Sequence, residues 1–318
     1  MTKRKKQAIE LSSKEASEAF GFSLDDFLKK VKELKIPVLK TGNYSEDVLE
    51  KYFRKTEENS HLANIIAISN QKGGEGKTTI SLFLSEALSL DAKVLLVDWD
   101  PQANATRLFI NEPERTVFDC LGYRKNPKSS VETVIIQVNS RLHLLPSSLS
   151  LANFTTAFER SDFELLKDAL LPILSSYDYI IIDCPPSLGL GLENALIAAD
   201  FILVPVQTRA FSVQGLKDLH ETIQKIQQKV NPKLKLLGAV FNQFEGNRAL
   251  SGLSETVKKY FPVFKTNIYR KESIPQAQAK RKMLGACDKD TYNSFLELAK
   301  EVRSKINVKE KYADYRIS

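Results

Sequence analysis

Residues 71–79 combine glycine, lysine and threonine in a spacing suited to holding phosphate groups. The run reads Gln71-Lys72-Gly73-Gly74-Glu75-Gly76-Lys77-Thr78-Thr79, follows an apolar segment and opens a helical pattern. Glycines let backbone N–H groups close around phosphate oxygens, and the start of a helix adds the positive end of its dipole. Lys77 is placed to reach the β- and γ-phosphates, and the Thr78 hydroxyl to complete a Mg²⁺ shell. The run therefore predicts a site for a nucleoside triphosphate.

Three carboxylates follow apolar strands farther along the chain. Asp98 and Asp100 come after Leu95-Leu96-Val97, and residues two apart share one side of an extended backbone. Asp183 ends a second apolar run, residues 179–182. One aspartate after a strand is usually a turn or cap residue. Three in this order, each after a strand of one sheet, favour a metal and water site beside the phosphates.

The elements that must position these side chains alternate from residue 64 onward. We expect strands at 65–69, 94–97, 142–145, 179–182, 201–206 and 236–241, and helices at 78–90, 162–171, 213–230, 250–260 and 292–306. Several strands are apolar on both faces, as buried parallel strands are. The pattern predicts an α/β fold with a mostly parallel sheet flanked by helices on both faces.

The phosphate run has Gln71 where the common pattern has glycine, and it carries a second lysine, Lys72. With the run from Asp98 to Gln102 and the run from Asp183 to Leu188, it resembles the deviant Walker A ATPases of the ParA/MinD family, and the second run is close to ParA proteins in particular. The resemblance covers about residues 64–306. It implies a P-loop NTPase fold, with ATP and Mg²⁺ as cofactors.

The resemblance also implies roles for individual residues. Lys72, Lys77 and Asp100 are the expected catalytic residues, with Asp100 orienting the attacking water. Thr78, Asp98 and Asp183 are expected at the Mg²⁺. The expected ATP-binding residues are Lys72, Gly73, Gly74, Glu75, Gly76, Lys77, Thr78, Thr79 and, where relatives often contact the adenine, Asn242.

The two unusual residues of the loop have different consequences. If two subunits face each other across ATP, Lys72 can reach the partner's γ-phosphate and stabilise the charge of phosphoryl transfer only in a homodimer. Glu75 stands where relatives carry a small or aliphatic residue. A carboxylate there is repelled by phosphate unless it points away or pairs with a base, and a harmless position facing solvent is the alternative.

The net charge of +7 is concentrated in one part of the chain. From residue 251 onward there are 15 Lys and Arg against 8 Asp and Glu, whereas residues 1–250 hold 31 of each. A local excess of positive charge attracts polyanions without regard to sequence, although an ordinary solvated face is the plain alternative. The candidates for nonspecific double-stranded DNA binding are Lys258, Lys259, Arg270, Lys271, Lys280, Arg281 and Lys282.

Residues 1–60 form a separate segment, and residues 61–318 the ATPase domain. Ser12-x-x-Glu15 and Ser23-x-x-Asp26 are capping boxes that open two short helices around Gly21, and a possible wing follows at 38–44. The arrangement resembles the winged helix-turn-helix domains of the MerR type, with a third helix from about residue 45. A helical dimerisation or packing appendage is the alternative.

Composition narrows the class of protein. The sequence has no apolar run near 18 residues and no apolar stretch after its basic start, so neither a membrane span nor a signal peptide is expected. Three scattered cysteines make a disulfide framework or a structural zinc site improbable and favour a reducing cytosol. The polar C-terminus lacks the membrane-binding helix of MinD proteins.

The working hypothesis is a DNA-segregation ATPase, cytoplasmic and nucleoid-associated, without a membrane partner. The resemblance to ParA proteins implies that an ATP-bound dimer coats DNA, that a ParB-like partner stimulates hydrolysis above a weak basal rate, and that residues 1–60 allow autorepression. The alternative is a nucleotide-gated DNA-binding regulator that hydrolyses little because Glu75 weakens the site.

Overall fold

The computed structural model describes residues 10–19, 23–33, 36–39, 41–45, 48–49, 62–121, 129–153, 163–208, 212–245 and 250–313. The chain divides into two compact units, Met1–Leu62 and Ala63–Ser318. This division lies two residues beyond the boundary that we placed after residue 60.

The larger unit is built on a seven-stranded sheet in the order β5-β6-β4-β7-β3-β8-β9. All neighbouring strands are parallel except β5, which is antiparallel to β6. The mostly parallel sheet expected from the sequence is confirmed, but the short edge strand β5 was not predicted. The bounds are β3 Asn64–Ile68, β4 Val94–Asp98, β5 Ile136–Gln137, β6 Leu142–Leu145, β7 Tyr179–Asp183, β8 Phe201–Gln207 and β9 Lys235–Asn242.

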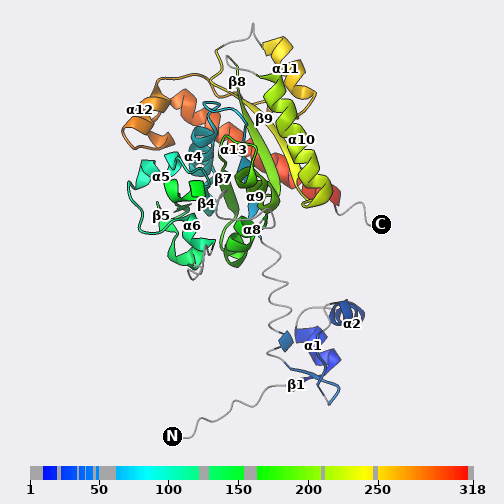
Figure 1. The fold of residues 1–318 in the computed structure, drawn as a ribbon. Coiled ribbons are helices and arrows are strands. Elements are labelled where there is room, and N and C mark those ends of the chain that lie inside the picture. Colours follow the sequence, from blue (N-terminus) through cyan, green and yellow to red (C-terminus); the bar gives the residue numbers. More distant parts are fainter. Residues whose placement is uncertain are drawn as a thin grey trace. The chain divides into compact units, whose positions relative to one another are not determined.

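Helices cover both faces of the sheet, as Figure 1 shows. One apolar cluster joins the sheet to α4, α5 and α13, and a second cluster joins its other face to α6, α8, α9, α10 and α11. The bounds are α4 Lys77–Leu88, α5 Asn104–Phe109, α6 Val117–Cys120, α8 Leu165–Leu170, α9 Leu190–Ala198, α10 Val213–Lys229, α11 Leu250–Lys258, α12 Ser273–Ala279 and α13 Lys289–Ala313, with 3₁₀ turns η1 Val131–Thr133, η2 Leu149–Asn153, η3 Leu171–Ser176 and η5 Leu284–Ala286.

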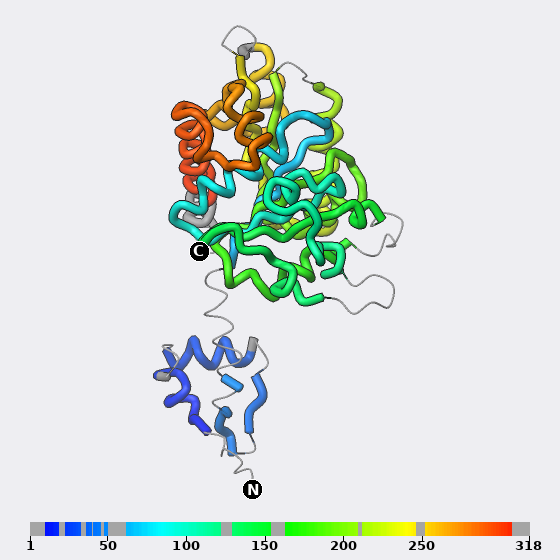
Figure 2. Tube along the Cα trace, turned by 90° about the vertical axis from the view of Figure 1, so that its left-hand side faces the viewer, coloured from blue at the N-terminus to red at the C-terminus, as the bar shows by residue number. Residues whose placement is uncertain are grey.

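Segments far apart in the sequence meet around α4. The long helix α13 packs against it, with Phe83 and Phe295 in an edge-to-face contact at 5.2 Å between ring centroids. The tube in Figure 2 shows the same neighbourhood from another side. Helix α4, which the phosphate run opens, is therefore fixed between the sheet and the C-terminal helix.

The smaller unit has its own core. It contains β1 Glu10–Leu11, α1 Ser13–Ala19, α2 Leu24–Glu33 and β2 Tyr44–Ser45, and β1 pairs with β2 in antiparallel register. Among its described residues, the buried apolar ones are Ala16, Phe27, Val31, Ile36, Tyr44 and Leu49.

The first capping box of the smaller unit forms completely: Ser12 N donates to Glu15 Oε2, and Glu15 N donates to Ser12 Oγ. The second forms in part: Asp26 N donates to Ser23 Oγ, and the return bond to Asp26 Oδ2 comes from the Ser23 hydroxyl. The third helix does not start at Ser45, as expected, because Ser45 lies in β2; residues 48–49 are helical, and the rest of the expected helix lies outside the described part.

No helix among the described residues is long and apolar enough to cross a bilayer.

Candidate nucleotide site

The phosphate run forms a tight loop between β3 and α4. Gly74 and Gly76 have left-handed backbones, with φ of 83° and 87°, which side-chain-bearing residues rarely adopt. A Cβ on Gly73 or Gly74 would meet open space, whereas one on Gly76 would lie 2.0 Å from Nδ2 of Asn242. The loop is therefore open on the side of Gly73 and Gly74 and pressed against the end of β9 at Gly76.

Lys77 turns back across this loop from the first position of α4. Its Nζ donates a hydrogen bond to the backbone oxygen of Lys72 at 3.0 Å. Burial lowers the pKa of Lys77, while the negative charge of Asp183 acts in the opposite direction. A partly desolvated ammonium group over an open loop is the arrangement expected of a phosphate-binding lysine.

Asp98 and Asp183 are direct neighbours across the paired strands β4 and β7. Both are fully buried. Burial raises the pKa of each carboxyl group, and the nearby charge of the other carboxylate raises it further for Asp183. Two carboxyl groups this close and this deeply buried disfavour ionisation of both, and a bound cation would stabilise their charged forms.

The two carboxylates differ in their hydrogen bonds. Asp98 Oδ2 accepts from the backbone nitrogen and the hydroxyl of Thr106, both at 2.7 Å, and Oδ1 accepts from Asp100 N at 3.3 Å. Asp183 Oδ1 accepts from Ser81 Oγ at 3.0 Å, and the neighbouring side chain of Thr78 lowers the pKa of Asp183. Oδ2 of Asp183 is buried without a hydrogen-bond partner.

These contacts fit a Mg²⁺ ion beside Asp183 and Thr78 better than one bound directly by Asp98. The orphaned Asp183 oxygen is a hard ligand of the type Mg²⁺ prefers, and Mg²⁺ usually takes one or two protein ligands and completes its shell with water and phosphate. Asp98 is committed to Thr106, so its contribution to a cation is mainly electrostatic.

Asp100 follows β4 at the same edge of the sheet. Its Oδ1 accepts from Gln102 N at 2.9 Å, and its carboxylate is close enough to raise the pKa of Lys77. The backbone oxygen of Asp100 accepts from Ser147 Oγ at 2.9 Å. The loop after β4 is thus held rigidly enough to position a carboxylate near the phosphate run.

Glu75 does not face solvent, so the expectation of a solvent-facing side chain is wrong. Its side chain is 3% exposed and accepts a short hydrogen bond from the backbone nitrogen of Gln207. Its own backbone oxygen accepts from Asn242 Nδ2 at 2.9 Å. Burial raises the pKa of Glu75, while the Gln207 hydrogen bond and the charges of Lys72 and Lys77 lower it. Glu75 therefore ties the loop to the ends of β8 and β9.

Comparison with known proteins agrees with this geometry. The AAA domain family matches residues 63–236. The chain is 36% identical over 259 residues to the sporulation initiation inhibitor protein Soj of Bacillus subtilis, covering 76% of this chain and 98% of Soj. It is 38% identical over 207 residues to the chromosome partitioning protein ParA of Myxococcus xanthus, covering 63% of this chain and 72% of that protein.

The chain belongs to the ParA/Soj family.

A solved structure extends the comparison to bound ligands. Cobyrinic acid a,c-diamide synthase of Mycobacterium smegmatis, with bound ADP and magnesium, superimposes with a TM-score of 0.65 at 29% identity, covering 75% of this chain and 93% of that one. A protein of different activity thus shares the fold, so the fold alone does not define the reaction.

A cavity of about 350 Å³ lies beside the loop of this ParA/Soj chain, at the start of α4. Its lining includes Thr79, Asn242, Tyr269, Lys271 and Gln278. Asn242 lines this cavity, and its amide also donates to the backbone oxygen of Glu75. Asn242 therefore connects the cavity to the phosphate loop.

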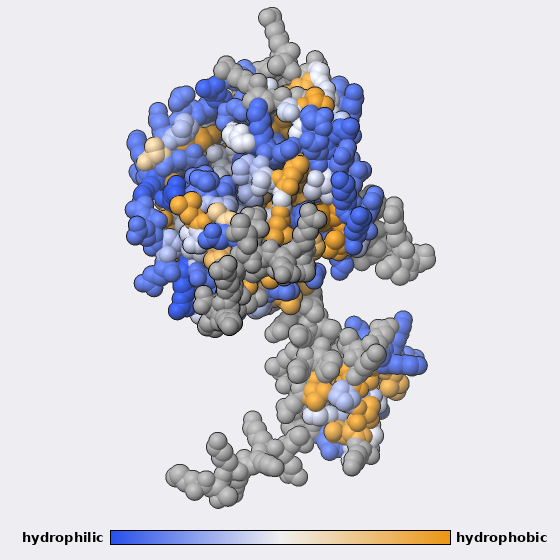
Figure 3. Space-filling view, in the orientation of Figure 1, coloured by the Kyte–Doolittle hydropathy of each residue, from blue (hydrophilic) through white to orange (hydrophobic). Residues whose placement is uncertain are grey.

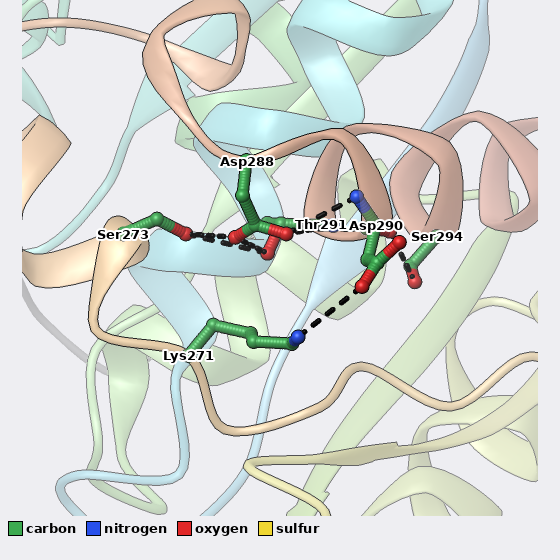
Figure 4. Close-up of polar contacts among 6 residues, drawn as sticks. All are labelled: Lys271, Ser273, Asp288, Asp290, Thr291 and Ser294. Carbon is green, nitrogen blue, oxygen red and sulfur yellow. Dashed lines mark hydrogen bonds and ion pairs between the residues drawn. The ribbon is translucent and has the colours of Figure 1, made fainter.

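The segment that closes this cavity is anchored on the first turn of α13 (Figure 4). Ser273 Oγ and Thr291 Oγ1 both donate to Asp288, and Lys271 Nζ lies 3.3 Å from Asp290. Hydrogen bonds from Ser273 and Thr291 lower the pKa of Asp288. The network fixes residues 271–273 relative to α13.

The basic candidates for DNA binding fall in separate places. Lys258 ends α11, beside α10, and Lys259 follows it. Residues 280–282 follow α12, whose Gln278 bonds to Thr79 of α4 at 3.2 Å. Figure 1 shows α11 and α12 apart on the larger unit. The structure therefore presents these residues as groups rather than as one continuous stretch.

Several of these basic side chains already have acidic or polar partners. Lys258 pairs with Glu255 at 2.8 Å and Arg270 with Glu245 at 2.9 Å; Lys271 pairs with Asp290, and Arg281 bonds to Asn111. Exposed pairs of this kind contribute about 0–1 kcal/mol, so phosphates can compete for them.

Sequence reasoning missed three residues of the site. Ser81 lies one helical turn after Lys77, so its contact with Asp183 could have been found from the spacing of α4. The contact of Thr106 with Asp98 and the bond from Gln207 N to Glu75 had no signal in the local sequence.

Proposed function

We propose that this protein is a DNA-partition ATPase that works as an ATP-dependent homodimer. The observation that carries the proposal is the meeting of the lysine-bearing loop, Asp100 and the orphaned oxygen of Asp183 at one edge of the sheet. Similarity to Soj and to a chromosome partitioning protein supports partition as the process.

ATP and Mg²⁺ are the cofactors of the site. The loop amides and Lys77 hold the β- and γ-phosphates, while Thr78 and Asp183 hold the metal. Bound Mg²⁺ supplies charge neutralisation on the β- and γ-oxygens. Asp100 orients the attacking water. Asp98, hydrogen-bonded to Thr106, adds negative electrostatic potential at the metal without binding it.

Lys72 supplies the link between nucleotide and dimer. It is exposed at the open mouth of the loop and lines the same cavity as Glu75, Ser212 and Asp218. Facing a second subunit, its ammonium group stabilises the partner's γ-phosphate, so the dimer favours ATP over ADP.

The ATP dimer binds double-stranded DNA without sequence preference through the basic residues at 258–259, 270–271 and 280–282. Dimerisation doubles the number of phosphate contacts and steepens the salt dependence. A ParB-like protein at a centromere-like site stimulates hydrolysis, which is weak without it, and releases the dimer. The protein would then reside in the cytoplasm on the nucleoid.

One observation favours a second function, a nucleotide-gated regulator with little turnover. The buried carboxylate of Glu75 adds negative charge to the loop that would hold the triphosphate. Autorepression through residues 1–60 belongs to either function and is tested by binding of the full chain to its upstream DNA.

Measuring ATP hydrolysis with and without nonspecific double-stranded DNA tests the proposal, with wild type, Lys72→Ala and Asp100→Ala compared. Weak turnover that DNA or the partner raises, and that both variants lose, supports the partition ATPase. ATP-dependent DNA binding without turnover, surviving in Asp100→Ala, favours the regulator.

A further inference from the structure

The exposed face of α2 in the smaller unit carries two large apolar side chains. Leu24 and Leu28 are 43% and 42% exposed, one helical turn apart. Apolar side chains reach the visible surface of this unit in Figure 3. The opposite face of α2 supplies Phe27 and Val31 to the core, so the two leucines are not needed for it.

Charge is ordered along the same face. Asp25 lies in the first turn of α2, and Lys29 and Lys32 follow toward its end, all exposed. Together with the two leucines they occupy positions i, i+1, i+4, i+5 and i+8, which is one stripe of a helix. The stripe begins with Leu24 and the acidic Asp25, has Leu28 at its middle, and ends with the basic Lys29 and Lys32.

This surface suits DNA poorly. In a helix-turn-helix protein, the first residues of the second helix approach base edges and phosphates. Here those residues include Asp25 and Asp26. Helix α2 as a whole carries three acidic and three basic residues and no arginine, whereas arginine makes the commonest specific base contact.

We propose that α2 is a self-association surface that pairs with α2 of a second copy in antiparallel orientation. A two-fold axis beside Leu28 places this leucine against its copy. The same axis places Asp25 opposite the second copy's Lys32 at both ends of the interface. A parallel arrangement would bring like charges together, so the charge order selects the antiparallel pair.

Pairing of two α2 helices alone is weak, and dimerisation of the larger units increases its apparent affinity. Stable interfaces bury roughly 1,200–2,000 Å² in total, far more than four half-exposed leucines provide. Dimerisation of the larger units on ATP raises the local concentration of the smaller units, which converts weak pairing into an added contribution to the dimer. This inference goes beyond the proposed function and does not depend on hydrolysis.

The test uses the full chain and reversal of charge at both ends of the stripe. Self-association is measured by sedimentation over a range of protein concentrations, with and without ATP, for Asp25→Lys, Lys32→Asp and the double variant. Each single reversal is expected to weaken association at least threefold, and the double variant to restore it, because the pairs re-form with opposite polarity. Glu18→Lys, exposed on α1, is the matched control.

A second variant reports on the axis directly. Leu28→Cys is expected to form a disulfide-linked dimer under mild oxidation, whereas Lys14→Cys on α1 is not. The proposal is overturned if the double variant stays as weak as the single ones. It is overturned equally if the reversals change only thermal stability, which places the stripe against another part of the same chain, or only binding to upstream DNA.

Discussion

Replacing Glu75 with glutamine should tighten nucleotide binding. The Glu75 carboxylate is buried in the loop and is fixed there by Gln207 N. At a separation of about 8 Å and an effective dielectric constant of about 20, two like unit charges repel by about 2 kcal/mol. Lys72 and Lys77 offset part of this repulsion, so we expect a net gain of about 1 kcal/mol, or about fivefold in the dissociation constant of Mg·ATP.

Glutamine is the informative replacement because its side-chain oxygen can still accept from Gln207 N. Glu75→Ala removes the acceptor as well, and hydrogen bonds to charged groups contribute about 1.5–3 kcal/mol. The alanine variant should therefore melt at a lower temperature than the glutamine variant. Trp99, the single tryptophan of the chain, is buried and lies between Asp98 and Asp100 in the sequence. Its fluorescence offers a signal for the titration.

The pH dependence gives an independent check. Burial raises the pKa of Glu75, so lowering the pH protonates it and removes the repulsion in the wild type. The advantage of Glu75→Gln should therefore shrink as the pH falls from about 8 to about 5. Equal or weaker binding by the glutamine variant at high pH, or a ratio that does not change with pH, would refute the electrostatic reasoning.

Three further predictions concern the same site. Gly76→Ala should destabilise the fold by more than 2 kcal/mol, since its Cβ would meet Asn242 at 2.0 Å, and thermal melts should show partial rescue by Asn242→Ala. Because the folded-state pKa of Asp183 is raised, the free energy of unfolding of the nucleotide-free protein should fall as the pH rises above about 4. Thermal melts at several pH values should show a weaker dependence of this free energy on pH for Asp183→Asn. Lys72→Ala should abolish ATP-dependent dimerisation in sedimentation while leaving Mg·ATP affinity within about threefold, because the lysine acts across the interface.

Local chemistry was predicted well from the sequence. The phosphate loop is encoded by contiguous residues, so the glycines, Lys77 and the following helix could be placed without knowing the fold. The predicted contacts of Ser12 with Glu15 and of Ser23 with Asp26 form because the partners are three residues apart. The six expected strands are present, since long apolar runs between turn signals identify buried parallel strands.

Contacts between distant residues were decided by the tertiary structure. Asp98 and Asp183 become neighbours only because β4 pairs with β7, and this pairing leaves one Asp183 oxygen without a partner. Edge strand β5 is two residues long, too short to show a period.

Glu75 shows most clearly what could not be predicted from the sequence alone. The sequence determined that a carboxylate stands in the phosphate loop, but not where it points. Gln207 and Asn242, more than 130 positions away, bury it and fix it. Burial and hydrogen bonding depend on which strand ends meet at the loop, and that is a property of the assembled sheet rather than of any local run of residues.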